Sequence, residues 1–161
     1  MTRARTYDGA VRTAVDPEQP HPHFYRFLTS VVVPRPIAWV STRSAAGVDN
    51  LAPHSFFTVA CVRPPIVAFT SVGRKDSLRN VEETGEFVVN LCPERLFAQV
   101  NATGTDFPKD VSEFDAVGLT REAALRVAPP RVAESPVALE CVLHSCVPLG
   151  DSTLILGHYA R

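Results

Sequence analysis

The 161-residue sequence has no apolar run near the roughly 18 residues that a membrane-spanning helix needs. Its first residues include arginines but no apolar stretch of the kind found in a secretory signal, so nothing there predicts export. The 16 basic and 17 acidic side chains leave a formal net charge of -1. This balance gives no electrostatic reason to expect a nucleic acid or an anionic membrane as partner. We therefore expect a cytoplasmic protein with no nucleic-acid or membrane partner.

Cysteine is scarce, and its spacing is irregular: Cys61, Cys92, Cys141 and Cys146, with no C-x-x-C pair. A chain of this length buries roughly 70% of the surface of its unfolded form, so it has little use for disulfides. We expect reduced, mostly buried thiols. Cys141, His144 and Cys146 look like metal ligands, but strand alternation would put Cys141 on one face and the other two on the opposite face. No metal site is predicted.

Three catalytic signatures are absent. The sequence has no G-x-x-x-x-G-K-[ST], no G-x-G-x-x-G after a strand and no G-x-S-x-G. His54 and Ser55 are neighbours, but adjacent residues of a strand point to opposite faces and do not form a base–nucleophile pair. A P-loop, a Rossmann nicotinamide site and hydrolase chemistry are therefore not expected, and no catalytic side chain is assigned.

What the sequence does contain is a globular composition with frequent proline. Hydrophobic residues make up 45% and charged residues 20%, and 14 prolines separate short runs rich in Val, Ile, Phe and Thr. These runs predict strands over residues 37–42, 51–62, 66–72, 87–91, 137–147 and 153–159. Trp39, in the first of them, is expected in the core; an aromatic that lines a ligand at a barrel mouth is the alternative. Residues 1–23 read as an N-terminal arm and residues 24–161 as one domain.

Helices are fewer and short. One is expected over residues 77–84, with Asp76 as N-cap and Gly85 as the residue that ends it. A second spans 93–102, and a third spans 113–117 between Ser112 and Gly118. Many strands with few helices favour a mainly β barrel or sandwich, because the regular alternation of a parallel α/β sheet is missing.

The most informative stretch for chemistry runs from Ser71 to Asn80, where a strand gives way to a helix. Free N–H groups and the dipole at a helix N-terminus favour an anion. Arg74, Lys75 and Arg79 add positive charge, Ser77 adds a hydroxyl, and glycine at 73 lets the chain approach closely. Phosphate binding is one interpretation, and an ordinary helix cap with solvated basic side chains is the other.

A second stretch, Asn50 to Phe57, opens a strand with Asn, His and Ser around a proline. Because Pro53 holds the chain extended, the backbone can present N–H and C=O groups edge-on. Such an edge suits a planar heterocycle with donors and acceptors along its rim. The alternative is a strand that simply turns a polar face outward.

Five motifs together resemble one known family. They are residues 29–42 (TSVVVPRPIAWVST), 50–57 (NLAPHSFF), 64–69 (PPIVAF), 75–80 (KDSLRN) and 83–90 (ETGEFVVN). Their order and spacing are similar to those of the flavin reductase-like FMN-binding split-barrel proteins, which include flavoredoxin and the small components of two-component monooxygenases. The resemblance covers about residues 24 to 159.

The resemblance implies a Greek-key split β-barrel, usually a homodimer, that holds FMN without a covalent bond near the subunit interface; FAD stays open. It places Ser41 and Thr42 against the flavin and sets Asn50, Ala52, Pro53, His54 and Ser55 around its ring. It assigns the phosphate to Ser71, Arg74, Lys75, Ser77 and Asn80. Family members usually continue for a few tens of residues beyond the position of Arg161, with a final strand and a tail. Without these elements, an exposed strand edge would favour pairing with another chain.

The implied activity is that of an NAD(P)H:flavin oxidoreductase. The flavin supplies the redox chemistry while the protein binds and orients it, which agrees with the absence of an obvious acid or base. Electrons would pass to a monooxygenase or another acceptor. Two other readings stay open: a flavin-binding module without reductase activity, and an interaction protein without cofactor.

Overall fold

The computed structural model describes residues 3–7, 10–14, 24–108 and 110–160, and the chain divides into the compact units Met1–Pro34 and Arg35–Arg161. In the first unit, β1 (Arg3–Tyr7) and β2 (Ala10–Ala14) pair as an antiparallel hairpin, and α1 (Phe24–Val31) follows later in the chain. The sequence predicted none of these elements. Residues 15–23 of the predicted arm lie outside the described residues, and the boundary at residue 23 stays a prediction.

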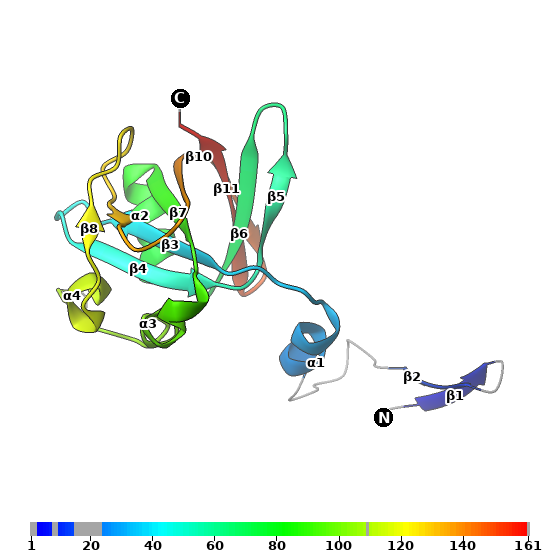
Figure 1. The fold of residues 1–161 in the computed structure, drawn as a ribbon. Coiled ribbons are helices and arrows are strands. Elements are labelled where there is room, and N and C mark those ends of the chain that lie inside the picture. The colour runs from blue at the N-terminus through cyan, green and yellow to red at the C-terminus, as the bar shows by residue number, and fades with distance from the viewer. Residues whose placement is uncertain (1–2, 8–9, 15–23, 109, 161) are drawn as a thin grey trace. The chain divides into compact units, whose positions relative to one another are not determined.

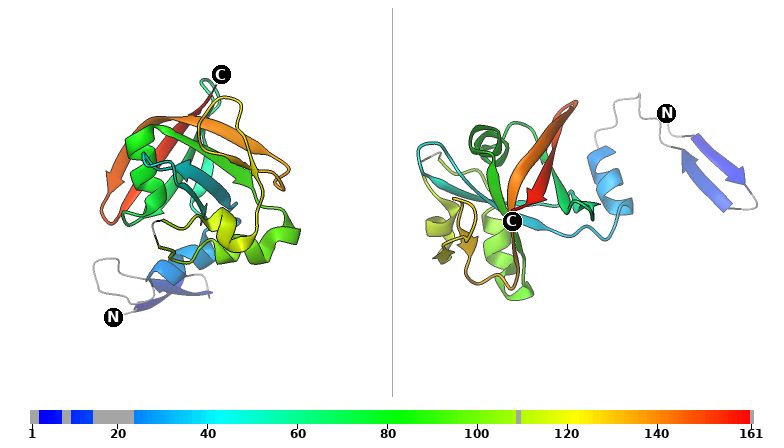
Figure 2. Two further views of the ribbon diagram at one scale, coloured as in Figure 1. Left: turned by 90° about the vertical axis from the view of Figure 1, so that its left-hand side faces the viewer. Right: turned by 90° about the horizontal axis from the view of Figure 1, so that it is seen from above.

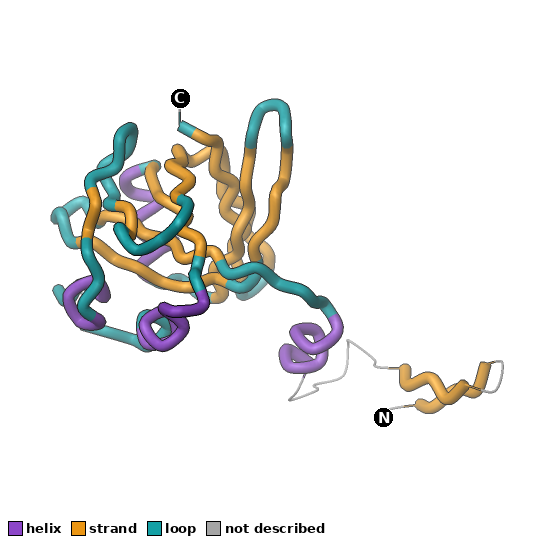
Figure 3. Tube along the Cα trace, viewed as in Figure 1, coloured by secondary structure: helices purple, strands orange, loops and turns teal. Residues whose placement is uncertain are grey.

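The second unit is built on a seven-stranded antiparallel sheet in the order β4-β3-β7-β10-β11-β6-β5 (Figures 1 and 3). Its strands are β3 (Ala38–Arg43), β4 (Asp49–His54), β5 (Phe57–Cys61), β6 (Ile66–Val72), β7 (Glu86–Leu91), β10 (Ala138–Leu149) and β11 (Ser152–Tyr159). A short pair, β8 (Arg121–Glu122) and β9 (Arg131–Val132), forms a separate two-stranded sheet that packs against the main one, where the Val132 N–H donates to Asn90 Oδ1 of β7. The two edge strands, β4 and β5, are consecutive in the chain, so the sheet curls until its edges meet at one end (Figure 2). The predicted mainly β fold is confirmed.

Two apolar clusters lie on opposite sides of β3. Ala38 and Val40 belong to the larger cluster, with Phe69 and Phe87 from the sheet and Leu78 and Val81 from α2 (Asp76–Thr84). Trp39 points the other way and is fully buried in the second cluster, as expected for a core residue. That cluster is covered by η1 (Glu94–Leu96), α3 (Phe97–Ala102) and α4 (Glu113–Val117). Because successive side chains of a strand point to opposite faces, β3 contributes to both clusters and is buried on both faces.

The predicted ends of α2 and α4 at glycine are confirmed, but the predicted N-cap of α2 is not. Gly85 and Gly118 adopt left-handed conformations, with φ of 74° and 69°, and end α2 and α4 as predicted. The predicted N-cap Asp76 is wrong. Lys75 occupies the cap position and makes no side-chain cap hydrogen bond, while Asp76 lies in the first turn and pairs with Arg79. The carboxylate is therefore committed to a basic side chain instead of the helix amides.

Two of the predicted strands contain irregularities. The single strand expected over 51–62 is interrupted at residues 55–56 and forms β4 and β5. In β10, a bulge between Leu143 and Ser145 shifts the alternation, so Cys146 packs on the same cluster as Cys141 and not on the opposite face. His144 is exposed, and the described residues hold no group of three or more metal-ligating side chains. All four cysteines are free thiols, but only Cys141 is fully buried.

Among the described residues, no helix has both the length and the apolar character needed to cross a membrane.

Candidate functional site

The turn between β6 and α2 is held in place by hydrogen bonds on both sides of Gly73. Its φ of 75° lies in the region that favours glycine. The Gly73 N–H donates to the carbonyl oxygen of Asp151 over 2.9 Å, and the Ser71 hydroxyl donates to the carbonyl oxygen of Gly73 over 3.0 Å. The buried Ser71 side chain therefore shapes the turn and is already bonded within it.

The helix that follows begins without a side-chain cap. In the first turn, the Arg79 N–H donates to the carbonyl oxygen of Lys75 over 3.1 Å. The amides of residues 76–78 come before this bond, so they have no acceptor within the helix. Amides of this kind, at the positive end of the dipole of a nine-residue helix, favour a negatively charged group nearby.

Every basic side chain of this turn is already paired with a carboxylate. Arg74 Nη1 lies 2.8 Å from Glu82 Oε2, Lys75 Nζ lies 3.9 Å from Asp106 Oδ1, and Arg79 pairs with Asp76. The Arg74 and Lys75 side chains are 66% and 58% exposed. Exposed ion pairs contribute only about 0–1 kcal/mol, so a bound anion can replace these carboxylates at little cost.

Beside the turn lies a buried network of polar side chains that joins β4 to α2. Asn50 Nδ2 donates to Ser77 Oγ over 3.2 Å, and His54 Nε2 lies 3.3 Å from the same oxygen. One turn further along α2, Asn80 Nδ2 donates to Thr42 Oγ1 over 3.0 Å. The structure thus brings together five of the predicted site residues, but their side chains bond one another.

His54 is neutral in this environment. Burial lowers its pKa to about 4 from the ordinary 6.5; a backbone hydrogen bond with Thr70 acts in the opposite direction, and the charge of Lys75 lowers the pKa further. The residue is 8% exposed, and its ring stands 4.8 Å from the Phe69 ring, centroid to centroid. A neutral imidazole donates at one nitrogen and accepts at the other.

Ser41 stands apart from the other predicted site residues. It follows Trp39 on the face of β3 that points away from α2, and its hydroxyl donates to the carbonyl oxygen of Pro130. Thr42 faces α2, where it accepts the Asn80 hydrogen bond. The two neighbours therefore lie on opposite faces of the strand.

The outer edge of β4 offers fewer free backbone groups than the sequence suggested. The Leu51 N–H points outward and donates to Glu113 Oε2 over 2.8 Å, while Pro53, the next outward residue, has no N–H. Of the N–H and C=O groups expected along this edge, the N–H of Leu51 is therefore already paired and that of Pro53 is absent. Burial raises the pKa of the Glu113 carboxyl, which covers the strand edge from α4.

Removing this carboxylate is expected to cost stability. Glu113→Ala leaves the Leu51 N–H unpaired and should lower the free energy of unfolding by about 1–3 kcal/mol. Glu113→Gln keeps an acceptor oxygen and should lose much less. Urea denaturation of both variants measures the difference, and equal losses would show that the hydrogen bond contributes little.

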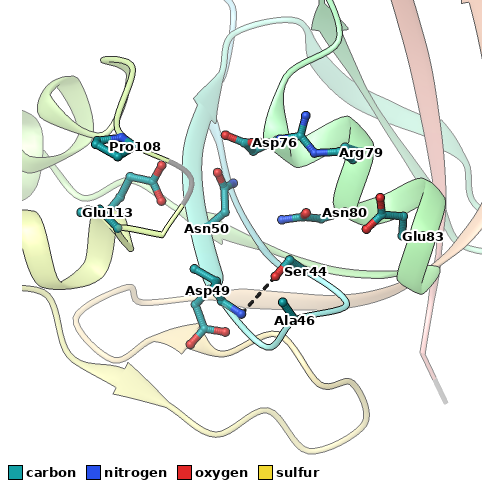
Figure 4. Close-up of a pocket in the computed structure, with 12 residues that line it drawn as sticks. Ser44, Ala46, Asp49, Asn50, Asp76, Arg79, Asn80, Glu83, Pro108 and Glu113 are labelled. Carbon is teal, nitrogen blue, oxygen red and sulfur yellow. Dashed lines mark hydrogen bonds and ion pairs between the residues drawn. The ribbon is translucent and has the colours of Figure 1, made fainter.

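A polar pocket of about 210 Å³ lies between β4, α2 and the segment that carries Glu113 (Figure 4). Asn50 and Asn80 line it together with four carboxylates, Asp49, Asp76, Glu83 and Glu113, and the basic Arg79. Asp49 pairs with Arg43 and Arg121, and Asp76 pairs with Arg79, so the negative charge that disfavours a phosphate here comes from Glu83 and Glu113. The turn before α2 is the better anion site.

A larger pocket, of about 420 Å³, opens at the other end of β4. Pro53 and Ser55 line it together with Phe97, whose side chain is 73% exposed, and Val100. Apolar walls with a few polar groups at the rim suit a planar ring. Of the predicted ring-bordering residues, Pro53 and Ser55 lie at this pocket and Asn50 lies at the polar one.

Sequence reasoning assigned no role to Glu113 or Asp106. Each acts on a residue far away in the chain, Leu51 and Lys75 respectively. No local pattern marks such contacts. The need of an edge strand for a partner was the only available hint for Glu113.

Comparison with known proteins gives a consistent result. The family described as "Flavin reductase like domain" matches residues 30–160. An uncharacterized protein of Aquifex aeolicus is 43% identical over 138 residues, which cover 83% of this chain and 70% of the relative. An uncharacterized protein of Deinococcus radiodurans is 43% identical over 142 residues, with 83% and 63% covered. The chain therefore spans about two thirds of the length of these relatives.

Solved structures share the fold. Nitrilotriacetate monooxygenase component B from Bacillus cereus superposes with a TM-score of 0.86 at 34% identity, covering 92% of this chain and 79% of that one. The 2-nitrobenzoate 2-nitroreductase of Pseudomonas fluorescens gives a TM-score of 0.85 at 30% identity, covering 92% and 75%. Flavoredoxin of Desulfovibrio vulgaris (Miyazaki F) gives 0.75 at 22% identity, covering 81% and 69%, which shows likeness of fold alone.

Proposed function

Because the chain belongs to the flavin reductase-like family, we propose that it is an FMN-binding, NAD(P)H-dependent oxidoreductase that passes electrons to a separate acceptor. The family supports a flavin oxidoreductase in general. The choice of FMN, the nicotinamide donor and the residues below are proposals for this chain.

The observation that carries the proposal is the uncapped start of α2 directly after a basic turn. A dianionic phosphate fits the amides of residues 76–78, with Lys75 and Arg74 within reach once they exchange their carboxylate partners. The donor set of this chain therefore suits the phosphate of FMN. Ser71 and Ser77 support the site by shaping the turn and the first helical turn.

The ring of the cofactor would lie along β4, bordered by Ala52, Pro53, His54 and Ser55. The half-buried Pro53 and the exposed Phe97 offer apolar surface there, and the half-buried Ser55 adds a hydroxyl. FMN, when bound, supplies the chemistry of accepting a hydride and releasing electrons. The protein contributes binding, orientation and an open approach for a nicotinamide or an acceptor.

An absorption spectrum of the purified protein with added FMN tests this function. We expect a bound flavin band that bleaches when NADH or NADPH is added without oxygen. Binding without bleaching by either nicotinamide would leave a flavin-binding module, and no flavin uptake would leave an interaction protein. Either outcome contradicts the proposed oxidoreductase.

Lys75→Ala tests the phosphate contact. Loss of one charge-assisted hydrogen bond of about 1.5–3 kcal/mol should weaken FMN binding by about tenfold or more, while riboflavin, which lacks the phosphate, should bind as before. Quenching of flavin fluorescence measures both affinities. Arg63→Ala removes the same charge at the opposite end of β6 and serves as the control. Unchanged FMN affinity in Lys75→Ala would remove Lys75 from the site.

We also propose that the protein acts as a homodimer. The support is the family resemblance, together with exposed apolar side chains in the second unit such as Val59, Val62 and Phe97. Light scattering on the purified protein should give twice the mass of one chain, and a monomer at micromolar concentration would contradict the proposal. The cytoplasmic location stays a prediction.

A further inference from the structure

We propose that His54 is a positioning residue for the phosphate site: its ring fixes the hydroxyl of Ser77 and, through it, the first turn of α2. This inference rests on the proposed binding of FMN. It differs from a direct contact between these side chains and the flavin, because it assigns both ring nitrogens to the protein itself.

The direction of each hydrogen bond in the network follows from the partner at its end. His54 Nδ1 lies 3.3 Å from the carbonyl oxygen of Thr70, which can only accept, so Nδ1 carries the proton. In the neutral ring, Nε2 is then the acceptor, and it receives the proton of the Ser77 hydroxyl over 3.3 Å. Ser77 Oγ in turn accepts from Asn50 Nδ2.

This order leaves the Ser77 hydroxyl without a proton for the phosphate. A serine hydroxyl has one O–H, and in this network it points at His54. The backbone N–H of Ser77 remains, since it lies in the uncapped first turn. The residue therefore serves the anion through its amide, and its side chain serves as the attachment point.

Burial makes this attachment specific. Asn50, His54 and Ser77 are 8%, 8% and 1% exposed, so water does not readily replace the lost partner when one is removed. The cap residue Lys75 gives the helix start no side-chain bond. The link from Ser77 to β4 therefore holds the helix start against the sheet.

The neutral state of His54 is part of the arrangement. The desolvated ring stays unprotonated at neutral pH, and the charge of Lys75 acts in the same direction. A protonated ring would carry a donor at both nitrogens and would lose the acceptor that Ser77 needs. The phosphate site therefore depends on which nitrogen of His54 holds the proton.

A matched pair of amide variants separates the two ends of the ring. In His54→Gln the side-chain oxygen can reach the place of Nε2 and accept from Ser77; in His54→Asn the amide reaches only the place of Nδ1, toward Thr70. We expect FMN affinity within about threefold of wild type for His54→Gln and about tenfold weaker for His54→Asn. Because His54 also borders the proposed ring site, the readout is the ratio of FMN affinity to riboflavin affinity. This ratio should stay near the wild-type value in His54→Gln and fall about tenfold in His54→Asn.

Ser77→Ala and the double variant with His54→Asn complete the test. If the two side chains act as one unit, Ser77→Ala weakens FMN binding about as much as His54→Asn, and the double variant is no worse than either. Equal FMN affinities for the Gln and Asn variants, or additive losses in the double variant, would overturn the inference. A wild-type protein that binds no FMN would overturn the proposed function as well, so the two failures are distinguishable.

The proton position can be measured without any variant or ligand. Nitrogen-15 NMR of the histidine rings at neutral pH should show His54 protonated at Nδ1 and unprotonated at Nε2. The opposite tautomer would contradict the hydrogen-bond order, whatever the flavin does.

Discussion

The free energy of unfolding is expected to fall by about 3 kcal/mol between about pH 7 and about pH 4 through the titration of His54 alone. The pKa of this ring is about 4 in the folded protein and near the ordinary 6.5 when the chain is unfolded. A difference of about 2.5 units at about 1.36 kcal/mol per unit gives this magnitude.

The sign follows from where the proton binds first. Between these two pKa values the unfolded chain takes up a proton that the folded protein resists, so stability falls as the pH falls. The contribution is fully present above the unfolded value and lost as the pH approaches the folded value. Lys75 is the charged neighbour that favours the neutral ring, and Thr70 opposes it.

Urea denaturation of the wild type and His54→Gln across this pH range isolates the effect. Both proteins share the titration of their carboxylates, so the difference between the two curves reports His54. Over this range, we expect the free energy of unfolding of the wild type to fall by about 3 kcal/mol more than that of His54→Gln. Parallel curves would show that His54 titrates normally and that its ring is not desolvated.

Gly157→Ala is expected to destabilise the fold by more than about 3 kcal/mol, above the usual range for overpacking. A Cβ at this position of β11 would lie 2.0 Å from Cζ and 2.7 Å from Cε1 of Phe87, a fully buried ring. Phe87 packs edge-on to Phe69 at 5.3 Å, and Phe69 contacts the His54 ring. Because Phe87 is fully buried and packs on Phe69, it must displace neighbouring core side chains to relieve the clash.

Two variants make this prediction specific. In Gly157→Ala combined with Phe87→Leu the ring is absent, so the double variant should lose less than the sum of the single losses. Gly104→Ala is the control, because its Cβ would meet Pro53 Cγ at 3.3 Å and the Asn101 carbonyl oxygen at 3.2 Å, which small shifts can relieve. Thermal unfolding of the wild type, both single variants, the double variant and Gly104→Ala measures these losses. Equal losses at Gly157 and Gly104 would contradict the steric argument.

The sequence predicted most strands of the sheet because their limits are encoded locally. The run of Val, Ile and Phe between two prolines and a glycine predicted a strand over residues 66–72, which is the full length of β6. Gly85 and Gly118 end their helices for a local reason too, because the left-handed backbone conformation at a helix end favours glycine. Periodicity and turn residues are enough for such elements.

Features that depend on distant contacts escaped the sequence. The break after His54 and the bulge near Leu143 leave no mark in the alternation of apolar residues. Asp76 pairs with Arg79 and lies inside the helix while Lys75 is the cap residue, and Glu113 covers an edge strand 62 residues away. Such pairings are decided by the folded sheet.

In the candidate site, too, the sequence predicted which residues come together but not how they are bonded. The resemblance assigned Ser71, Ser77 and Thr42 to the flavin, and the structure places them at the turn before α2 or against α2. It could not tell that these hydroxyls already have partners within the protein. That information comes only from hydrogen-bond directions in three dimensions, which decide whether a residue offers its side chain or its amide.

The ratio of the riboflavin and FMN dissociation constants of the wild-type protein tests most directly whether the start of α2 holds the cofactor by its phosphate. Two charge-assisted hydrogen bonds of about 1.5 kcal/mol each predict FMN binding about a hundredfold tighter than riboflavin. Calorimetric titration at low salt gives both constants. Equal affinities, or no binding of either flavin, would contradict the account.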